Sequence, residues 1–332
     1  MSYRQGRINR EGITVPIPQG PRLYEQMLRV NLWEQKLLWL IDEGHVSGFY
    51  HSGRGQEAIP VGACDTLRQD DYIMYAHRGV GYLLAKGLAM EKLFGDFLAN
   101  TAGTTGGLGA GIVHIAWPEL GILGQSGTLG GCFPISVGAA LSAQYRGTDQ
   151  VCVCFFGEGT SSRGTFHEGL NASALWKLPV VWLCENNGYA ATVPSRDGLS
   201  VRDIADRAAG YGIPGVVIDG MDVDVVRETV AEAVARARAG GGPTLIEAKT
   251  YRFRGHYEGD PQTYRSRDEV NEWRKRDPIT TYADRLLSSG QVSKDELDEI
   301  ARRVRAEVDA AADSAMAAPP PDRDRIYRHV YA

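Results

Sequence analysis

The sequence predicts an α/β fold, in which helices flank both faces of a doubly wound, mainly parallel sheet. Two observations carry this prediction. From residue 151 onward, short apolar runs alternate with segments of helical periodicity and with polar loops. The apolar runs are nearly continuous, which is typical of parallel strands buried on both faces. A chain that repeats strand, loop and helix in this way builds a sheet covered by helices.

The expected elements follow that alternation. Buried strands are expected at 151–156, 180–184, 215–219 and 244–250. Helices are expected between them, at about 164–177 and at 224–240. An earlier helix is expected at 22–43, where apolar residues recur at helical spacing and the pattern stops at Gly44.

The chain is expected to consist of a short arm and one large domain. Residues 1–21, rich in proline, glycine and arginine, are expected to form an extended arm. Residues 22–332 are expected to form a single α/β domain with a C-terminal helical extension. Ser293 and Glu296 have the spacing of a capping box at the start of that extension, and prolines at 319–321 end it.

Two stretches are expected to be loops. Residues 45–150 are unusually glycine-rich, so long connections are expected around short apolar segments. Loops of such length inside a compact domain are usually functional or partly disordered. Residues 251–269 are polar and carry several arginines, which favours a long exposed loop.

Composition excludes several classes of protein. Of the 332 residues, 43% are hydrophobic and 23% charged, which is ordinary for a globular protein. The net charge of −5 argues against a general nucleic-acid or membrane-surface binder. No apolar run approaches the roughly 18 residues of a membrane span. The first residues lack the apolar core of a signal peptide, and a cytoplasmic location is expected.

The cysteines are expected to be packing residues. There are five, and Cys152 and Cys154 stand two apart in a strand-like run, where they would face the same side. A zinc site would need two further ligands at short spacing, and none is nearby. Buried thiols are therefore the favoured interpretation.

A carboxylate and an amide pair mark the ends of two expected strands. Glu158 stands between two glycines after the first strand, and Asn186–Asn187 follow the next. Because ligands bind at the carboxyl ends of parallel strands, these groups could hold Mg²⁺ or Ca²⁺ and, through it, a diphosphate. The G-x-G alone is a weak signal and lacks the third glycine of a dinucleotide site. Two asparagines could also simply form a turn.

The wider segment resembles a known family. GEG followed about thirty residues later by NN resembles the thiamine-diphosphate motif, whose usual acid is Asp. The segment GTFHEGLNASALWKLPVVWLCENNGYA is similar to the α subunit of the thiamine-diphosphate-dependent first component of 2-oxo-acid dehydrogenase complexes. The resemblance covers about residues 22–320. It also includes GFYHSGRGQEAIPVGA, DDYIMYAHRGVGYLLAKG, GTLGGCFPISVGAAL and TYRFRGHYEGDPQTYRSRDE.

The resemblance implies thiamine diphosphate and Mg²⁺ as cofactors. Glu158, Asn187 and the carbonyl of Tyr189 take the positions of the magnesium ligands. The residues implied to contact the diphosphate are Gly159 and Thr160 through their backbone, Arg78 through its guanidinium, and His77, where Tyr is usual in pyruvate and branched-chain members.

The same resemblance assigns the reacting end of the cofactor. Gly127 and Leu129 fall where the family contacts the aminopyrimidine, and Leu129 is the wedge that bends the cofactor. His256 matches a loop histidine beside the reacting carbon and the diphosphate, and His51 a histidine of the substrate channel. Both are the expected catalytic residues, whereas His114, in an apolar stretch, is expected to be structural.

The resemblance also implies partners. The activating glutamate of this family lies on a separate β subunit, so an α2β2 heterotetramer is expected, with transfer of the acyl unit to a lipoyl-bearing acyltransferase component. Substrates would be small 2-oxo acids or a hydroxyketone such as acetoin. The alternative is a non-catalytic diphosphate-binding or regulatory subunit of such a complex.

Two positions depart from the pyruvate pattern. Tyr257 replaces the regulatory serine of the animal enzyme, and Val80 replaces a histidine. The segment GHYEGDPQTYR is most similar to acetoin dehydrogenase members. The choice between pyruvate, branched-chain 2-oxo acids and acetoin stays open at this point.

Overall fold

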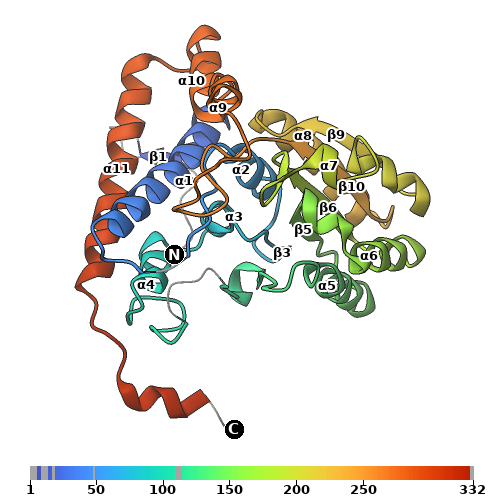
Figure 1. The fold of residues 1–332 in the computed structure, drawn as a ribbon, viewed down its shortest axis with the longest axis horizontal. Coiled ribbons are helices and arrows are strands. Elements are labelled where there is room, and N and C mark those ends of the chain that lie inside the picture. The colour runs from blue at the N-terminus through green and yellow to red at the C-terminus, as the bar shows by residue number, and fades with distance from the viewer. Residues whose placement is uncertain (1–5, 9–13, 17–18, 48, 110–113, 330–332) are drawn as a thin grey trace.

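The computed structural model is built on one six-stranded parallel sheet (Figure 1). It describes the chain except residues 1–5, 9–13, 17–18, 48, 110–113 and 330–332. The strand order is β4-β3-β5-β6-β10-β9. The strands are β3 (Tyr72–Met74), β4 (Ile122–Gly124), β5 (Cys152–Gly157), β6 (Val180–Asn186), β9 (Gly215–Asp219) and β10 (Thr244–Lys249). Helices cover both faces, which confirms the doubly wound α/β fold.

The central strands divide the core into two halves. In β5, Val153 and Phe155 face one apolar cluster, while Cys152, Cys154 and Phe156 face the other. This alternation is the two-residue period of a strand with both sides covered. All five cysteines are free and buried, which confirms that they pack in the core.

The first face of the sheet carries most of the helices. They are α1 (Gln19–Asp42), α2 (Ala58–Cys64), α3 (Val80–Ala85), α4 (Met90–Phe97), α8 (Val223–Arg238), α10 (Pro278–Ser288) and α11 (Lys294–Ala317). The long helices α1 and α11 lie side by side at the outer edge (Figure 1). The second face is covered by α5 (Cys132–Arg146), α6 (Gly164–Leu175) and the 3₁₀ segment η3 (Ile204–Tyr211).

The strands and helices expected after residue 151 are confirmed within two residues at most ends. The capping box of α11 is also present, with Ser293 and Glu296 each accepting from the other's backbone. The first helix begins at Gln19, three residues before its expected start. Pro21 is tolerated there because the first turn of a helix needs no amide donor from it. The division into an arm and one domain stays a prediction.

Two expectations about loops were wrong in part. The glycine-rich stretch 45–150 contains α2, β3, α3, α4, β4 and α5, with a short 3₁₀ turn η1 (Pro118–Leu120). The polar run after β10 begins buried, because Tyr251, Arg252 and Phe253 are all covered. Only its later part is open, and it leads into α9 (Arg267–Arg274).

The remaining elements are short. β1 (Gly6–Ile8) pairs with β2 (Thr14–Pro16), and β7 (Tyr189–Ala190) pairs with β8 (Val193–Pro194). The other short helices are η2 (Glu158–Ser162), α7 (Ser195–Gly198) and η4 (Arg323–His329). Among the helices of the described chain, none has the length and apolarity that a membrane span requires.

Candidate active site

The site begins where β5 and β6 end. The two strands are paired in parallel up to Gly157 and Glu185, so the residues that follow them lie at the same edge of the sheet. Glu158 opens η2, and Asn187 begins the turn toward β7. The backbone amide of Asn187 donates to Glu158 Oε2 at 3.4 Å. The sequence-predicted acid and amide are therefore in contact.

Asn186 and Asn187 have different hydrogen-bond partners. Asn186 Nδ2 donates to the buried Glu247 Oε1 on β10 at 2.6 Å, while its Oδ1 accepts from the amide of Gly188 at 3.0 Å. Asn186 thus fixes the turn to the neighbouring strand. The Oδ1 of Asn187, by contrast, accepts a long hydrogen bond from the amide of Tyr189, at 3.3 Å. Gly188 has φ +87°, a conformation that favours glycine.

Glu158 is a buried carboxylate that needs a counter-charge. It is 2% exposed, and burial raises its pKa, although Arg252 and Arg78 act in the opposite direction. An uncompensated carboxylate in the interior is costly, and a bound cation removes that cost. Glu158 lies beside the turn that carries Asn187 Oδ1 and the carbonyl of Tyr189, and all three groups have oxygen atoms of the kind that hard cations prefer.

Arg78 contacts two of the chain segments that surround the site, one at Ser52 and the other at His256. Its guanidinium donates to the carbonyl of Ser52 at 2.7 Å and to the carbonyl of His256 at 3.2 Å. Burial lowers the pKa of Arg78 to about 10, so it stays charged at neutral pH. Its Nε is buried without a hydrogen-bond partner among the described residues. Arg78 therefore has donor capacity left for an anion.

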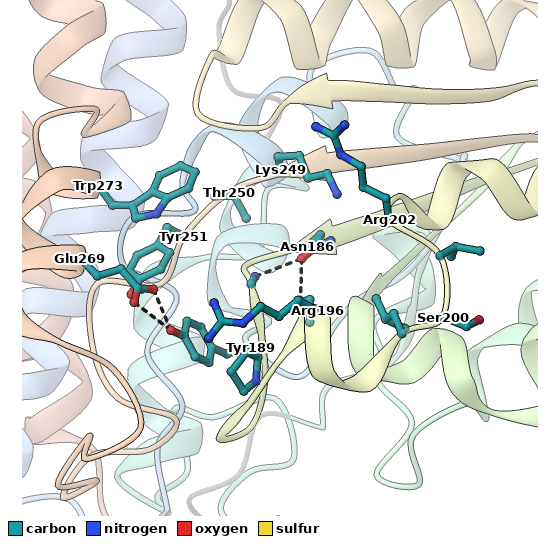
Figure 2. A pocket seen from close by; sticks show the side chains of 15 residues that line it. Asn186, Tyr189, Arg196, Ser200, Arg202, Lys249, Thr250, Tyr251, Glu269 and Trp273 are labelled. Carbon is teal, nitrogen blue, oxygen red and sulfur yellow. Dashed lines mark hydrogen bonds between the residues drawn. The ribbon is translucent and has the colours of Figure 1, made fainter.

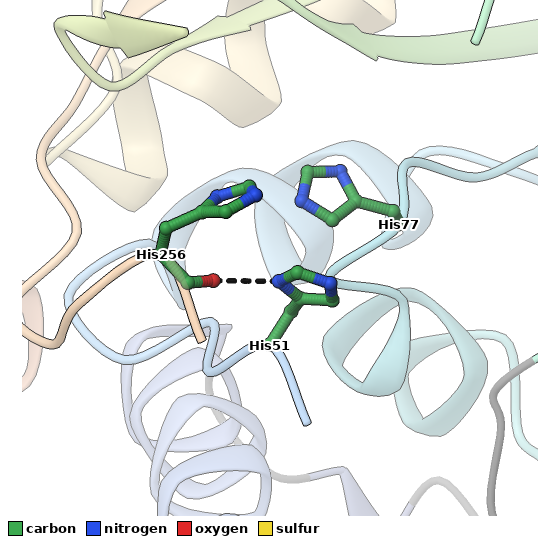
Figure 3. Close-up of side chains that lie close together, drawn as sticks. All are labelled: His51, His77 and His256. Carbon is green, nitrogen blue, oxygen red and sulfur yellow. Dashed lines mark hydrogen bonds between the residues drawn. The ribbon is translucent and has the colours of Figure 1, made fainter. Parts of the chain in front are cut away.

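Three histidines meet in one cavity of about 350 Å³. His51, His77 and His256 come from segments far apart in the sequence and turn their rings toward one another (Figure 3). The ring centroids of His51 and His77, and of His51 and His256, are 4.8 Å apart. His51 Nδ1 is 2.6 Å from the carbonyl oxygen of His256. The two expected catalytic histidines are thus adjacent, and His77 joins them.

All three imidazoles are held neutral. Burial lowers the pKa of each, and the Arg78 cation lowers it further. The pKa of His256 falls to about 4. At neutral pH these side chains can therefore accept a proton or a metal ion, or donate one N–H each, without carrying charge.

Gly127 and Leu129 line the same cavity as the three histidines. Leu129 is 45% exposed, a high fraction for a leucine. An adjoining crevice is lined by His77, Leu129 and Thr160, so it connects the histidines with the η2 turn. Gly159 packs against Ala190, where a Cβ atom would come within 2.7 Å of the Ala190 Cβ. Every residue predicted for the site therefore lies in or beside this region.

A second cavity of about 590 Å³ lies beside the same turn (Figure 2). Its wall includes Asn186 and the ring of Tyr189, whose hydroxyl donates to Glu269 at 2.8 Å. It is larger than the histidine cavity, but His51, His77, Gly127 and Leu129 all lie in the smaller one. The residues expected at the reacting end of the cofactor therefore line the smaller cavity.

Several residues of the site were not predicted from the sequence. Arg252 is 1% exposed and donates to the carbonyls of Tyr189 and Ala191, so it secures the turn that carries Asn187. His114, expected to be structural, is exposed at the wall of the histidine cavity. The apolar wall of that cavity is formed by Phe49, Tyr50, Val80 and Phe97. A buried arginine in a polar run, and aromatic residues far away in sequence, leave no local signal.

The comparison with protein families agrees with this geometry. Residues 25–323 match the model of the family described as "Dehydrogenase E1 component". The chain belongs to the dehydrogenase E1 component family. This confirms the family resemblance seen in the sequence.

Individual relatives span nearly the whole chain. The α subunit of acetoin:2,6-dichlorophenolindophenol oxidoreductase from Bacillus subtilis is 40% identical over 98% of this chain and 97% of its own length. The protein of the same name from Cupriavidus necator is 39% identical over 98% of both. The α subunit of the pyruvate dehydrogenase E1 component from Rhizobium meliloti is 36% identical over 93% of this chain and 89% of its own.

Proposed function

We propose that this E1-family chain is the α subunit of an oxidoreductase that cleaves acetoin or a 2-oxo acid with thiamine diphosphate. One observation carries the proposal. The acid–amide turn, formed by Glu158 and Asn187, lies at the same edge of the sheet as the buried Arg78 and the three neutral histidines. A non-catalytic subunit would not need to keep this set together. The family and the relatives support the catalytic interpretation.

Membership of the E1 family implies thiamine diphosphate, and the residues present fit it. Arg78 Nε and His77 Nε2 are buried without hydrogen-bond partners among the described residues, as expected of polar atoms that await a ligand. Gly157 leaves open space where a Cβ atom would stand, so a phosphate could approach the backbone there. The implied diphosphate contacts are Arg78, His77, His256 and the backbone of Gly159 and Thr160, with Gly127 and Leu129 at the aminopyrimidine.

We propose Mg²⁺ as the ion that joins this diphosphate to the protein. Glu158, Asn187 and the carbonyl of Tyr189 would hold it, because Mg²⁺ prefers oxygen ligands and shares its remaining positions with phosphate. The raised pKa of Glu158 supports this role, since a bound cation would restore its charged form. Glu in place of Asp adds one methylene, which a small shift of the η2 turn can accommodate.

The cofactor, when bound, supplies the carbon nucleophile and accepts the electron pair of the broken carbon–carbon bond. The chain's own residues would bind the cofactor and orient the substrate beside it. Leu129 would press on the cofactor from one side, and the apolar wall of Phe49, Val80 and Phe97 would exclude water. His51 and His256, neutral at pH 7, would exchange protons with the substrate oxygens.

We propose a β subunit as the partner that completes the site. The relatives are named as α subunits, which implies such a partner. The described cavity contains histidines but no carboxylate side chain that could activate the aminopyrimidine. The β subunit would supply that glutamate in an α2β2 heterotetramer, and a lipoyl-bearing acyltransferase component would accept the acyl unit.

Acetoin is the substrate that the cavity favours. Among its lining residues in the described chain there is no lysine or arginine, so a carboxylate would find no direct cationic partner. A neutral hydroxyketone is better matched to neutral imidazoles and an aromatic wall. The relatives named for acetoin agree with this choice. A 2-oxo acid remains the second candidate, supported by the pyruvate dehydrogenase relatives.

The test uses the chain co-expressed with its β subunit. Acetoin, pyruvate and a branched-chain 2-oxo acid are supplied separately, with 2,6-dichlorophenolindophenol as electron acceptor. We expect the wild-type pair to turn over acetoin fastest. Glu158→Ala should reduce turnover at least a hundredfold and abolish its dependence on Mg²⁺, because the ion loses its only charged ligand from this chain.

Glu228→Ala is the matched control, since Glu228 is exposed on α8 and should leave turnover unchanged. Circular dichroism establishes that both variants are folded. Full activity of Glu158→Ala would refute the metal assignment. Turnover by the α chain without its partner would refute the shared site.

A further inference from the structure

We propose that His51, His77 and His256 form a binding site for a divalent transition-metal ion of the Zn²⁺ class. This site is separate from the oxygen ligands at Glu158, and it would be occupied when the cofactor and substrate are absent. Nothing in the proposed chemistry uses a transition metal. The site is a consequence of the way in which the three rings meet.

The geometry is close to that of a three-histidine metal centre. One ligand nitrogen from each ring can be chosen so that all three lie within 4.8 Å of one another. Zinc bound at about 2.0–2.1 Å from each nitrogen in a tetrahedron places those nitrogens about 3.4 Å apart. Binding would therefore draw the three rings closer together than they are in the metal-free chain. The fourth position would face the cavity, as in sites that keep one position open.

His51 is already oriented as a metal ligand. Its Nδ1 stands 2.6 Å from the carbonyl oxygen of His256, so Nδ1 must carry the proton and donate it. Nε2 is then left with a free lone pair. A histidine ligand that donates its other N–H to a carbonyl is the usual outer arrangement around a protein-bound metal.

His77 supplies the observation that points most directly to a ligand. Its Nε2 is buried and has no hydrogen-bond partner among the described residues. In Figure 3 the ring of His77 extends toward His51 and His256 rather than away from them. A buried polar atom without a partner is costly, and a metal ion in the middle of the three rings would satisfy it.

His256 can join the set by a change of tautomer. At present Arg78 Nη2 stands 3.2 Å from His256 Nδ1 and also donates to the carbonyl of His256. When Nδ1 takes the proton, Nε2 becomes the ligand. Arg78 keeps the carbonyls of Ser52 and His256 as acceptors, so the change leaves the guanidinium with partners.

The local charge permits a dication. Arg78 and Arg252, which both act on the rings of His77 and His256, oppose it. Three buried carboxylates, Glu34, Glu158 and Glu185, also act on Arg78 and offset its charge. Imidazole nitrogen is a poor ligand for Mg²⁺ and a good one for Zn²⁺ and Co²⁺, so the two classes of ion would separate between the two sites.

An ion at this position would occupy the space of the reacting groups. The three histidines line the cavity together with Gly127 and Leu129, the residues proposed for the aminopyrimidine. A bound transition metal and a bound substrate would therefore exclude each other. The site would make the α chain sensitive to zinc, with inhibition that a chelator reverses.

The binding test uses the full-length α chain alone, free of cofactor and titrated with Co²⁺. We expect one ion per chain, with the strong visible absorption of tetrahedral cobalt, and displacement by Zn²⁺. His51→Gln, His77→Gln and His256→Gln should each weaken binding at least tenfold. His114→Gln is the control, because His114 lines the same cavity outside the cluster.

Weakening by His114→Gln equal to that of the cluster variants, or absence of the cobalt band from the folded wild-type chain, would overturn the proposal. Circular dichroism of each variant separates loss of ligands from loss of fold. The result is independent of the proposed activity. An inactive α–β pair would leave cobalt binding intact, and a failed cobalt titration would leave the turnover of acetoin unaffected.

Discussion

His256 is held at three points by neighbouring groups. Its amide donates to Asp260 Oδ2 at 2.6 Å, and its carbonyl accepts from His51 and from Arg78. These contacts fix the backbone of His256 although it belongs to a long loop, and Arg78 Nη2 lies 3.2 Å from the ring nitrogen Nδ1. Its environment, rather than its sequence position, determines its protonation.

The depressed pKa of His256 makes folding sensitive to acid. An unfolded histidine binds a proton below about pH 6.5, whereas the folded one binds it only near pH 4. The unfolded state therefore binds more protons between these values, and this contribution to stability is lost as pH falls from about 6.5 to about 4. His256→Gln lacks that contribution.

The measurement is the midpoint of thermal unfolding for wild type and His256→Gln between pH 4.5 and 7.5. We expect the wild type to lose more stability toward acid than the variant does. His45→Gln, which changes an exposed histidine, should follow the wild type at every pH. A constant difference between wild type and His256→Gln across the range would contradict the prediction.

The residues of the acid–amide turn could be predicted because each stands directly after an apolar strand. Glu158 and Asn187 follow β5 and β6, and these two strands are parallel neighbours in the sheet. The two residues therefore lie close together. Arg252 could not be found in this way. It stands in a polar run that indicates exposure, and it is buried because its guanidinium stacks near Tyr189 and Tyr264 and finds carbonyl acceptors.

At the scale of elements, α11 shows what a local signal can specify. Ser293 Oγ accepts from the amide of Glu296, and Glu296 Oε2 accepts from the amide of Ser293. This reciprocal cap satisfies two amides that the helix leaves without internal partners. Because the contacts are local, the sequence alone was enough to locate the start of the helix.

Removal of this cap should destabilise the chain measurably. Ser293→Ala is expected to lower the free energy of unfolding by about 1 kcal/mol, with no effect on cobalt binding or on turnover. Urea unfolding followed by circular dichroism gives the value. Ser288→Ala, which removes an exposed hydroxyl near the end of α10, is the control and should cost less. Equal losses in the two variants would show that the cap is not what stabilises α11.

The glycine-rich elements between 45 and 150 were missed for a physical reason. Glycines there allow neighbouring helices to pack closely. In α2, a Cβ atom on Gly62 would stand 2.7 Å from the carbonyl oxygen of Val223 on α8. Such residues lower the intrinsic tendency to form helices and strands, while tertiary packing restores it. The glycine-rich sequence therefore indicated loops in places where the folded chain has buried helices.

On the scale of the whole molecule, the helices that cover the second face of the sheet carry exposed apolar residues. Helices α5 and α6 bury one side against the core and leave apolar residues on the other. Tyr145 is 91% exposed and Leu175 72%, and Trp176, Ile135 and Leu141 are also open. An apolar surface on neighbouring helices is typical of an interface, and we predict that the proposed β subunit covers it.

Charge on this surface should weaken assembly. Tyr145→Glu and Leu175→Glu are each expected to shift the co-expressed chains from the heterotetramer toward free subunits, because a carboxylate would be buried without a partner. Light scattering coupled to gel filtration measures the distribution. Arg305→Glu on the exposed side of α11 is the control. Unchanged assembly in both interface variants would remove this surface from the interface.

The hydrogen bond between Asn186 and Gly188 has a consequence for the chemical lifetime of the protein. Asn187–Gly188 is an asparagine–glycine sequence, the kind most prone to spontaneous deamidation, in which the glycine amide attacks the asparagine side chain. Here that amide is engaged by Asn186 Oδ1 at 3.0 Å, within a turn fixed to β10. Asn186 therefore protects Asn187 from deamidation, and Asn187 should deamidate much more slowly in the folded chain than in the unfolded chain.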